Sequence, residues 1–149
     1  MKSRKDEMLR RQRATIFPGS KIDVEIAPLV RALKADGVLT QGSCSGHGRR
    51  DRNTYVAIAL NGPSEVARLC SRLQLLESDE LFLDLKLIYR GGCYACDFAD
   101  HPTWLMFWLE VYRPDRQPVD RAQLQKLATD YRRLSRKAAK PTRSTGRAA

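Results

Sequence analysis

The fold is decided by residues 55–76, which read YVAIALNGPSEVARLCSRLQLL. Apolar residues alternate along the first six positions, as in a β-strand with one buried face: Val56, Ile58 and Leu60. The sequence NGPS at 61–64 then predicts a turn, and Pro63 suits the first turn of a helix. Apolar residues recur beyond it at helical spacing: Val66, Leu69, Leu73 and Leu76. A strand that leads directly into an amphipathic helix predicts a fold that mixes α and β structure.

The same patterns extend outward from this unit. We expect two further helices, over about 24–36 and 119–138, and three further strands, over 38–41, 81–89 and 103–112. Asp23 is the expected N-cap of the first helix. The whole predicts an α+β domain over 21–138 with a four-stranded, mainly antiparallel sheet and three helices in the order αββαββα. A basic arm at 1–20 and a basic, disordered tail at 139–149 flank it.

The last predicted strand, 103–112, is apolar on both faces. A strand of this kind usually lies at the centre of a sheet that is covered on both sides. We therefore expect its aromatic residues to belong to the core, with base stacking as the alternative: Trp104, Phe107, Trp108 and Tyr112. Glu110 in the same strand is expected to pair with Arg113, with a role as an acid or base as the alternative.

The net charge of +10 over 149 residues is concentrated at the two ends. Residues 1–20 carry six basic and two acidic side chains, and residues 131–149 carry seven basic and no acidic ones. Such segments bind nucleic acid or other polyanions without sequence preference, although solubility alone also explains them. No apolar run is long enough to span a membrane, and the charged N-terminus lacks the apolar part of a signal peptide. We therefore expect a cytoplasmic protein with a polyanionic partner and no membrane contact.

Two short motifs carry metal-binding side chains, CSGH at 44–47 and CYAC at 93–96. Three thiolates and one imidazole form the ligand set of a closed, structural zinc site that would tie two loops together. The predicted ligands are Cys44, His47, Cys93 and Cys96, and Asp97 and His101 are further candidates. Incidental cysteines, or a separate role for Cys44 and His47, are the alternatives. A redox dithiol is less favoured because no helix N-terminus follows Cys93 to lower its pKa.

The two motifs are related by a constant interval. Cys44 and Cys93 are 49 residues apart, as are His47 and Cys96, and the strands that follow begin 49 residues apart. The repeated αββ order is compatible with an internal duplication. In a duplicated fold the two loops would occupy related positions and could meet near a pseudo-two-fold axis.

The first motif lies in a glycine-rich loop, GSCSGHG at 42–48. Its small residues let backbone amides approach a ligand, and the arginines that follow are suited to clamp phosphates. The loop matches neither a Walker loop nor a dinucleotide-binding fingerprint. The candidate ligand-binding residues are Ser43, Ser45, Gly46, Arg49, Arg50, Arg52 and, from the second loop, Tyr94. An ordinary hairpin loop with solvated arginines is the alternative.

Residues 22–60, and this loop above all, resemble small uncharacterised bacterial and phage proteins with a Ser-Cys-x-Gly-His-Gly loop. The loop is also similar, more distantly, to the Ser-Cys-Ser-Gly-Arg signature of the wybutosine-synthesis tRNA methyltransferase family. Ser43, Cys44, Ser45 and Gly46 match that signature, and His47 stands where the family has Arg. The likeness covers about a quarter of the chain. It implies an α/β fold, S-adenosylmethionine as cofactor and a guanosine-derived tRNA base as substrate.

Three functions are open at this point. We favour a zinc-stabilised module that binds nucleic acid, RNA included, or a nucleotide. The alternative is a tRNA-modifying transferase in which Cys44 is the nucleophile and His47 its base. A further alternative is a phage or mobile-element protein that sequesters a ligand or blocks a host protein.

Overall fold

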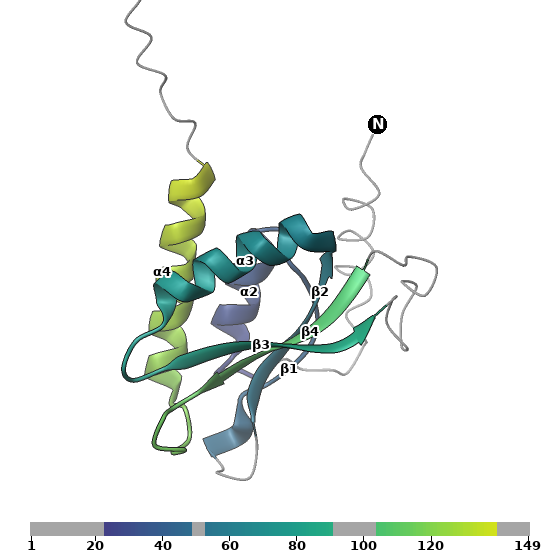
Figure 1. Cartoon of the computed structure of the whole chain (residues 1–149). Helices are drawn as coiled ribbons and strands as arrows, with labels where there is room; N and C mark the ends of the chain where they lie inside the picture. The colour runs from purple at the N-terminus through teal and green to yellow at the C-terminus, as the bar shows by residue number, and fades with distance from the viewer. Residues whose placement is uncertain (1–22, 49–52, 91–103, 140–149) are drawn as a thin grey trace, which may run out of the picture.

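The computed structural model describes residues 23–48, 53–90 and 104–139. Within them lie three α-helices and one antiparallel sheet of four strands (Figure 1). The helices are α2 (Ala27–Ala35), α3 (Gly62–Leu76) and α4 (Arg121–Ala139). The strands are β1 (Leu39–Cys44), β2 (Thr54–Asn61), β3 (Phe82–Arg90) and β4 (Trp104–Tyr112), and a short 3-10 helix, η1 (Gly46–Gly48), follows β1. The predicted α+β class and order of elements are confirmed. The predicted basic arm lies outside the described residues, as does the tail beyond Ala139.

Strand β1 is longer than predicted. It continues to Cys44, because Ser43 and Cys44 still pair with Val56 and Tyr55 of β2. Three of the seven residues of the predicted glycine-rich loop, 42–44, are therefore part of the sheet. Pairing with β2 extends the strand through these residues. Their own sequence is too polar and glycine-rich to predict a strand.

Helix α2 begins later than predicted, and Asp23 does not cap it. The residue before α2 is Ile26, which makes no side-chain capping bond. The backbone carbonyl of Asp23 accepts hydrogen bonds from the N–H groups of Ile26 and Ala27, at 3.2 and 3.0 Å. The Asp23 carboxylate contacts Ser45 instead. The Asp23 side chain therefore connects two segments of the fold, and backbone hydrogen bonds form the turn at the start of α2.

The strands run in the order β1-β2-β4-β3, and each adjacent pair is antiparallel. The connection through α3 carries the chain from β2 past β4 to the far edge of the sheet. All three helices cover the same face of the sheet (Figure 1). The alternating residues of β2 and β4 that point to this face are buried against the helices: Val56, Ile58, Leu60, Phe107, Leu109 and Val111. Each large apolar side chain buried there stabilises the fold by about 1.5–3 kcal/mol.

One polar cluster connects the three helices. Asp36, just after α2, forms an ion pair with Arg72 of α3 and lies 3.9 Å from Arg68. It also accepts a 2.7 Å hydrogen bond from the Tyr131 hydroxyl of α4. Burial raises the pKa of Tyr131, and the charges of Arg72 and Arg68 act in the opposite direction. Because the carboxylate has partners on two other helices, this cluster fixes how the helices pack around it.

The sheet has the symmetry that a duplication would produce, since both inner strands are second members of a hairpin. Ile58 of β2 pairs with Phe107 of β4, and these residues are also 49 positions apart. A two-fold axis at this pair would exchange the two ends of the sheet. Accordingly, the β1–β2 loop leaves one end and the β3–β4 loop leaves the other. The two loops thus start from related positions, as expected, but their anchoring strands do not bring them together at an axis.

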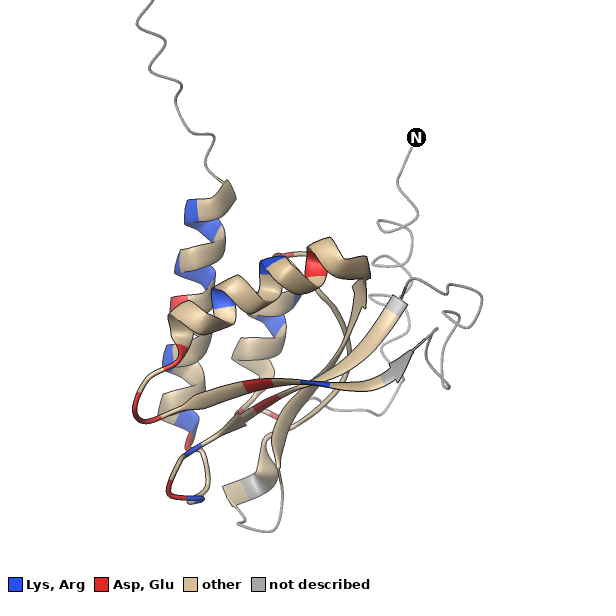
Figure 2. Ribbon diagram, in the orientation of Figure 1, with Lys and Arg blue, Asp and Glu red and all other residues tan. Residues whose placement is uncertain are grey.

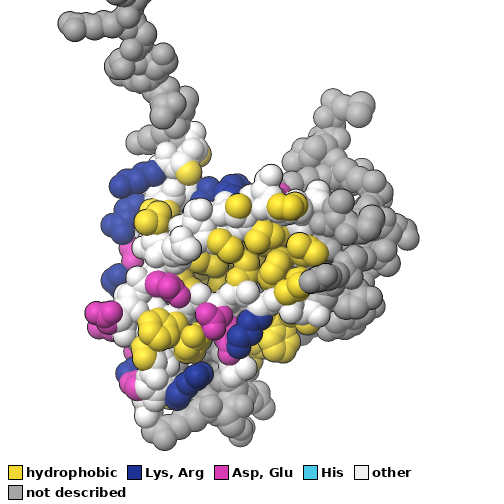
Figure 3. Space-filling view, in the orientation of Figure 1, with side chains coloured by type: hydrophobic (Ala, Val, Ile, Leu, Met, Phe, Trp, Pro, Cys, Tyr) yellow, Lys and Arg dark blue, Asp and Glu magenta, His cyan; other side chains and the backbone are white. Residues whose placement is uncertain are grey.

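The helices cover the β3 edge less completely than the centre of the sheet. Figure 3 shows hydrophobic side chains gathered between α3 and β3. Val66 and Leu85 are only partly buried there, and Leu87 is 44% exposed. None of the described helices is both long and apolar enough to cross a membrane.

Candidate nucleic-acid interface

The face of the sheet that points away from the helices carries aromatic and charged side chains. Phe107 and Trp108 are neighbours in β4 and point to opposite faces, because side chains alternate along a strand. Phe107 is 7% exposed and Trp108 is 37% exposed. The prediction that both faces of this strand are covered was therefore wrong at Trp108. The three helices all pack on the opposite face, although Met106 and Glu110, which share the face of Trp108, are each only 6% exposed.

Tyr55 and Trp108 form a stacked pair on this face. Their ring centroids are 4.7 Å apart and their planes differ by 19°. They sit diagonally on adjacent strands, since Tyr55 pairs with Glu110 and Trp108 pairs with Ala57. The contact holds both rings in place before any ligand arrives, so a further aromatic group can stack with little additional ordering.

Lys86 of β3 lies beside Trp108, its partner across the strands. Its ammonium forms an ion pair with the buried Glu110, and its side chain is 55% exposed. The hydrogen bond to Glu110 raises the pKa of Lys86 despite the opposing effect of desolvation. The predicted Glu110–Arg113 pair was wrong, because residues three apart on a strand point to opposite faces. Arg113 instead pairs with Asp115 through two hydrogen bonds of 3.0 and 2.7 Å.

A second aromatic group lies at the β1–β2 loop end of this face. Phe82 and Tyr112 pair across β3 and β4, with ring centroids 5.6 Å apart at an angle of 81°. Burial and a hydrogen bond from its hydroxyl to Asp84 raise the pKa of Tyr112. The guanidinium of Arg116 lies 5.1 Å from the Tyr112 ring centroid. Among the described residues of this face, Asp84 and Glu110 are both engaged by neighbours, and the exposed cations are Arg116 and Lys86, of which Lys86 is the partner of Glu110.

The turn after β1 is held by a set of specific hydrogen bonds. The backbone N–H and the hydroxyl of Ser45 both donate to the Asp23 carboxylate, at 3.1 and 3.2 Å. Thr54 donates from its hydroxyl to the Ser45 carbonyl at 2.9 Å. Gly46 adopts a φ of 76°, which other residues rarely reach. Sequence analysis missed the role of Asp23, because no periodic pattern connects residues 22 positions apart.

A small cavity lies between this turn and the connection from β4 to α4. Its volume is about 90 Å³. Its walls include Ser45, Gly46, Thr54, Glu110, Arg113 and Arg116. A polar cavity of this kind is roomy enough for a small polar group or for water molecules. Ser45 and Gly46 thus border a polar cavity, as candidate ligand-binding residues would, and Ser43 does not line it.

Cys44 is the one predicted metal ligand whose side chain the structure describes. It ends β1 opposite Tyr55, and its Sγ accepts a 3.4 Å hydrogen bond from the Gly46 N–H. The backbone of His47 lies in η1. The remaining predicted site residues lie outside the described ranges: Arg49, Arg50, Arg52, Cys93, Tyr94 and Cys96, together with Asp97 and His101. No cluster of three potential ligands occurs among the described side chains. The nucleophile and base pair of Cys44 and His47 stays a prediction.

Strand β1, which carries Cys44, and strand β3, which precedes the second cysteine motif in sequence, finish at opposite ends of the sheet. Cys44 lies in the row of Glu110, whereas Arg90, where β3 ends, lies in the row of Leu105. Five residues of strand separate these rows, about 16 Å, and three strand spacings add about 14 Å sideways. Cys93 is three residues beyond Arg90, and three residues span about 10 Å. A zinc ion shared by both motifs stays a prediction, and this separation counts against it.

Comparison with family models, with curated proteins and with solved structures found no match to this chain.

Proposed function

We propose that this protein binds single-stranded nucleic acid on the open face of its sheet. The observation that carries the proposal is the stacked Tyr55–Trp108 pair, with Trp108 exposed beside Lys86. The neighbouring residue Phe107 is buried on the other face of the same strand. The exposure of Trp108 is therefore specific to the face on which it lies. An exposed, pre-ordered tryptophan on a sheet is typical of surfaces on which unpaired bases stack.

Charge supports a polyanionic ligand. The chain carries 27 basic and 17 acidic residues. Among the described residues of the open face, Arg116 is an exposed cation beside Tyr112, and Lys86 is exposed although it is paired with Glu110, so a phosphate would compete with Glu110 for Lys86. A phosphate backbone that crosses the strands would meet these two cations while a base stacks on Trp108.

The geometry favours single strands over duplexes. In a duplex the faces of the bases are already stacked on one another, so an exposed aromatic ring reaches them only after unpairing. Stacking on Trp108 takes place on the surface of the sheet, and the proposal does not depend on zinc.

The test is equilibrium binding of labelled single-stranded RNA and DNA, measured by fluorescence anisotropy over a range of salt concentrations. Trp108→Ala removes one stacking surface and is expected to weaken binding about tenfold to a hundredfold, since one stacked base contributes about 1–3 kcal/mol. Trp108→Phe keeps an aromatic ring and is expected to retain most of the affinity. Circular dichroism and thermal melting establish that each variant is folded.

Leu75→Ala is the matched control, because Leu75 is an exposed apolar residue on α3, on the other side of the molecule. It is expected to bind as the wild type does. The proposal fails if wild-type protein does not bind single strands at low salt, or if Trp108→Ala binds as tightly as Leu75→Ala.

A further inference from the structure

Helix α4 continues beyond the part of it that the core requires. Its buried residues are Leu124, Leu127, Ala128 and Tyr131, and none of residues 132–139 is buried. Figure 1 shows the end of α4 rising past α3. Residues 136–139 are exposed and Arg132, Leu134 and Ser135 before them are only partly buried, so about two turns extend past the buried part of the helix, formed by good helix formers such as Arg, Leu, Ala and Lys.

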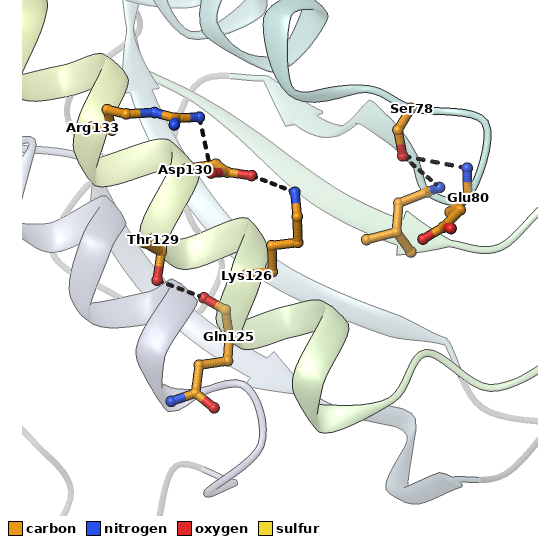
Figure 4. Close-up of polar contacts among 8 residues, drawn as sticks. Ser78, Glu80, Gln125, Lys126, Thr129, Asp130 and Arg133 are labelled. Carbon is orange, nitrogen blue, oxygen red and sulfur yellow. Dashed lines mark hydrogen bonds and ion pairs between the residues drawn. The ribbon is translucent and has the colours of Figure 1, made fainter.

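This extension is cationic, and its charge is only partly neutralised (Figure 2). Asp130 pairs with Lys126 at 2.8 Å and with Arg133 at 3.0 Å (Figure 4). The other cations of the extension are Arg132, Arg136 and Lys137, and they have no acidic partner in the described part of the chain. The helix dipole favours cations in the last turn, which gives Arg136 and Lys137 a structural reason. The helix dipole does not account for Arg132, which lies one turn earlier.

The cations share one side of the helix. At 3.6 residues per turn, positions 129, 132, 133, 136 and 137 fall within an arc of about 140°, opposite the buried positions. These residues line a shallow groove: Thr129, Arg132, Arg133, Arg136 and Lys137. The groove faces away from the core and lies on the helix side of the sheet, so it is separate from the face that carries Trp108.

We propose that the last two turns of α4 form a second nucleic-acid site, which binds the phosphate backbone without reading bases. The ligand is a duplex segment, because a free helix with cations along one side follows the phosphates that border a groove. Since the two sites lie on opposite sides of the sheet, one molecule holds a single strand and a duplex segment at the same time. This last step rests on the proposed function, whereas duplex binding by α4 does not.

The test compares two triple variants with equal net charge. Arg132→Gln/Arg136→Gln/Lys137→Gln removes three cations from the α4 groove, and Arg31→Gln/Lys34→Gln/Arg121→Gln removes three from elsewhere on the surface. For duplex DNA, the slope of log K against log salt is expected to fall by about 2–3 in the first variant, because each lost phosphate contact removes about 0.9. The second variant is expected to keep the slope. Equal slopes in the two variants would overturn the α4 site.

Simultaneous binding is tested by retention of a labelled duplex on beads that carry an unrelated single strand. Wild-type protein and the second triple variant are expected to retain the duplex. The first triple variant is expected to lose the duplex while it still binds the beads, and Trp108→Ala is expected to lose the beads while it still binds duplex in solution. If only the proposed function fails, wild-type protein binds duplex in solution but does not bind the single-stranded beads. Retention of duplex by neither wild type nor control, although each site binds alone, would overturn simultaneous binding.

Discussion

The two faces of the sheet use the same strand in different ways. On the face that the helices cover, Phe107 and Leu109 of β4 are almost completely buried in the hydrophobic cluster. On the other face, Trp108 remains 37% exposed and contacts Tyr55 through its ring. Both faces of β4 are apolar in sequence, so apolar composition does not by itself identify a core residue. The helices cover one face of β4, and the other is exposed at Trp108 although Met106, two residues away on that face, is buried.

The first prediction compares neighbouring aromatic residues of β4. Phe107→Ala leaves a cavity in the core and is expected to lower the free energy of unfolding by about 3–5 kcal/mol. Trp108→Ala removes a partly solvated ring and its contact with Tyr55, so the expected loss is about 1 kcal/mol. Urea denaturation of both variants measures the difference. Equal losses of unfolding free energy in the two variants would mean that Trp108 is as buried as Phe107. The proposal that Trp108 binds a ligand would then lose its support.

The second prediction concerns the helix side, where polar groups are structural. Asp36→Ala leaves Arg72 without its partner in a site where the Asp36 side chain is 9% exposed, and is expected to cost about 3 kcal/mol of stability. Asp79→Ala is the control, because Asp79 lies in an exposed turn and its removal is expected to change stability by less than about 0.5 kcal/mol. Thermal or urea unfolding measures both. A small loss in Asp36→Ala would mean that the helices pack without this cluster.

The third and smallest expected effect concerns the two ends of the sheet. Because Cys44 ends β1 at one end of the sheet and β3, which precedes the Cys93 motif in sequence, finishes at the other, Cys44→Ser is expected to leave the zinc content per chain unchanged. Cys93→Ser/Cys96→Ser is the comparison, and any zinc bound by that pair is expected to be lost in it. Metal content is measured by mass spectrometry on untagged protein. Loss of zinc in both variants would re-establish the cross-loop site and contradict the separation of the motifs.

The boundaries of the elements followed from local patterns where those patterns were strong. Strands β2 and β3 and helix α3 have regular apolar spacing and lie within one or two residues of their predicted positions. Strand β1 was predicted too short, because Gly42, Ser43 and Cys44 are sheet only through their pairing with β2. The capping role of Asp23 was wrong for a related reason, since its carboxylate bonds to Ser45, 22 residues away.

The candidate site shows the same division. The sequence singled out Cys44, Ser45 and Gly46, and the last two border a polar cavity. It also considered Trp108 as a stacking residue but favoured the core, and it did not pair Trp108 with Tyr55. That pairing depends on register across β2 and β4, which alternation along one strand cannot supply.

The sequence by itself determined the class of fold, the order of its elements and the excess of positive charge at its ends, because periodicity and charge are properties of short segments. Tertiary structure alone decided that Trp108 is exposed, which partners Glu110 and Asp23 take, and that strands β1 and β3 finish at opposite ends of the sheet. Each of these depends on how strands distant in sequence pair and where the helices pack. Those contacts depend on the free energy of the whole chain, which the pattern of a short segment does not determine.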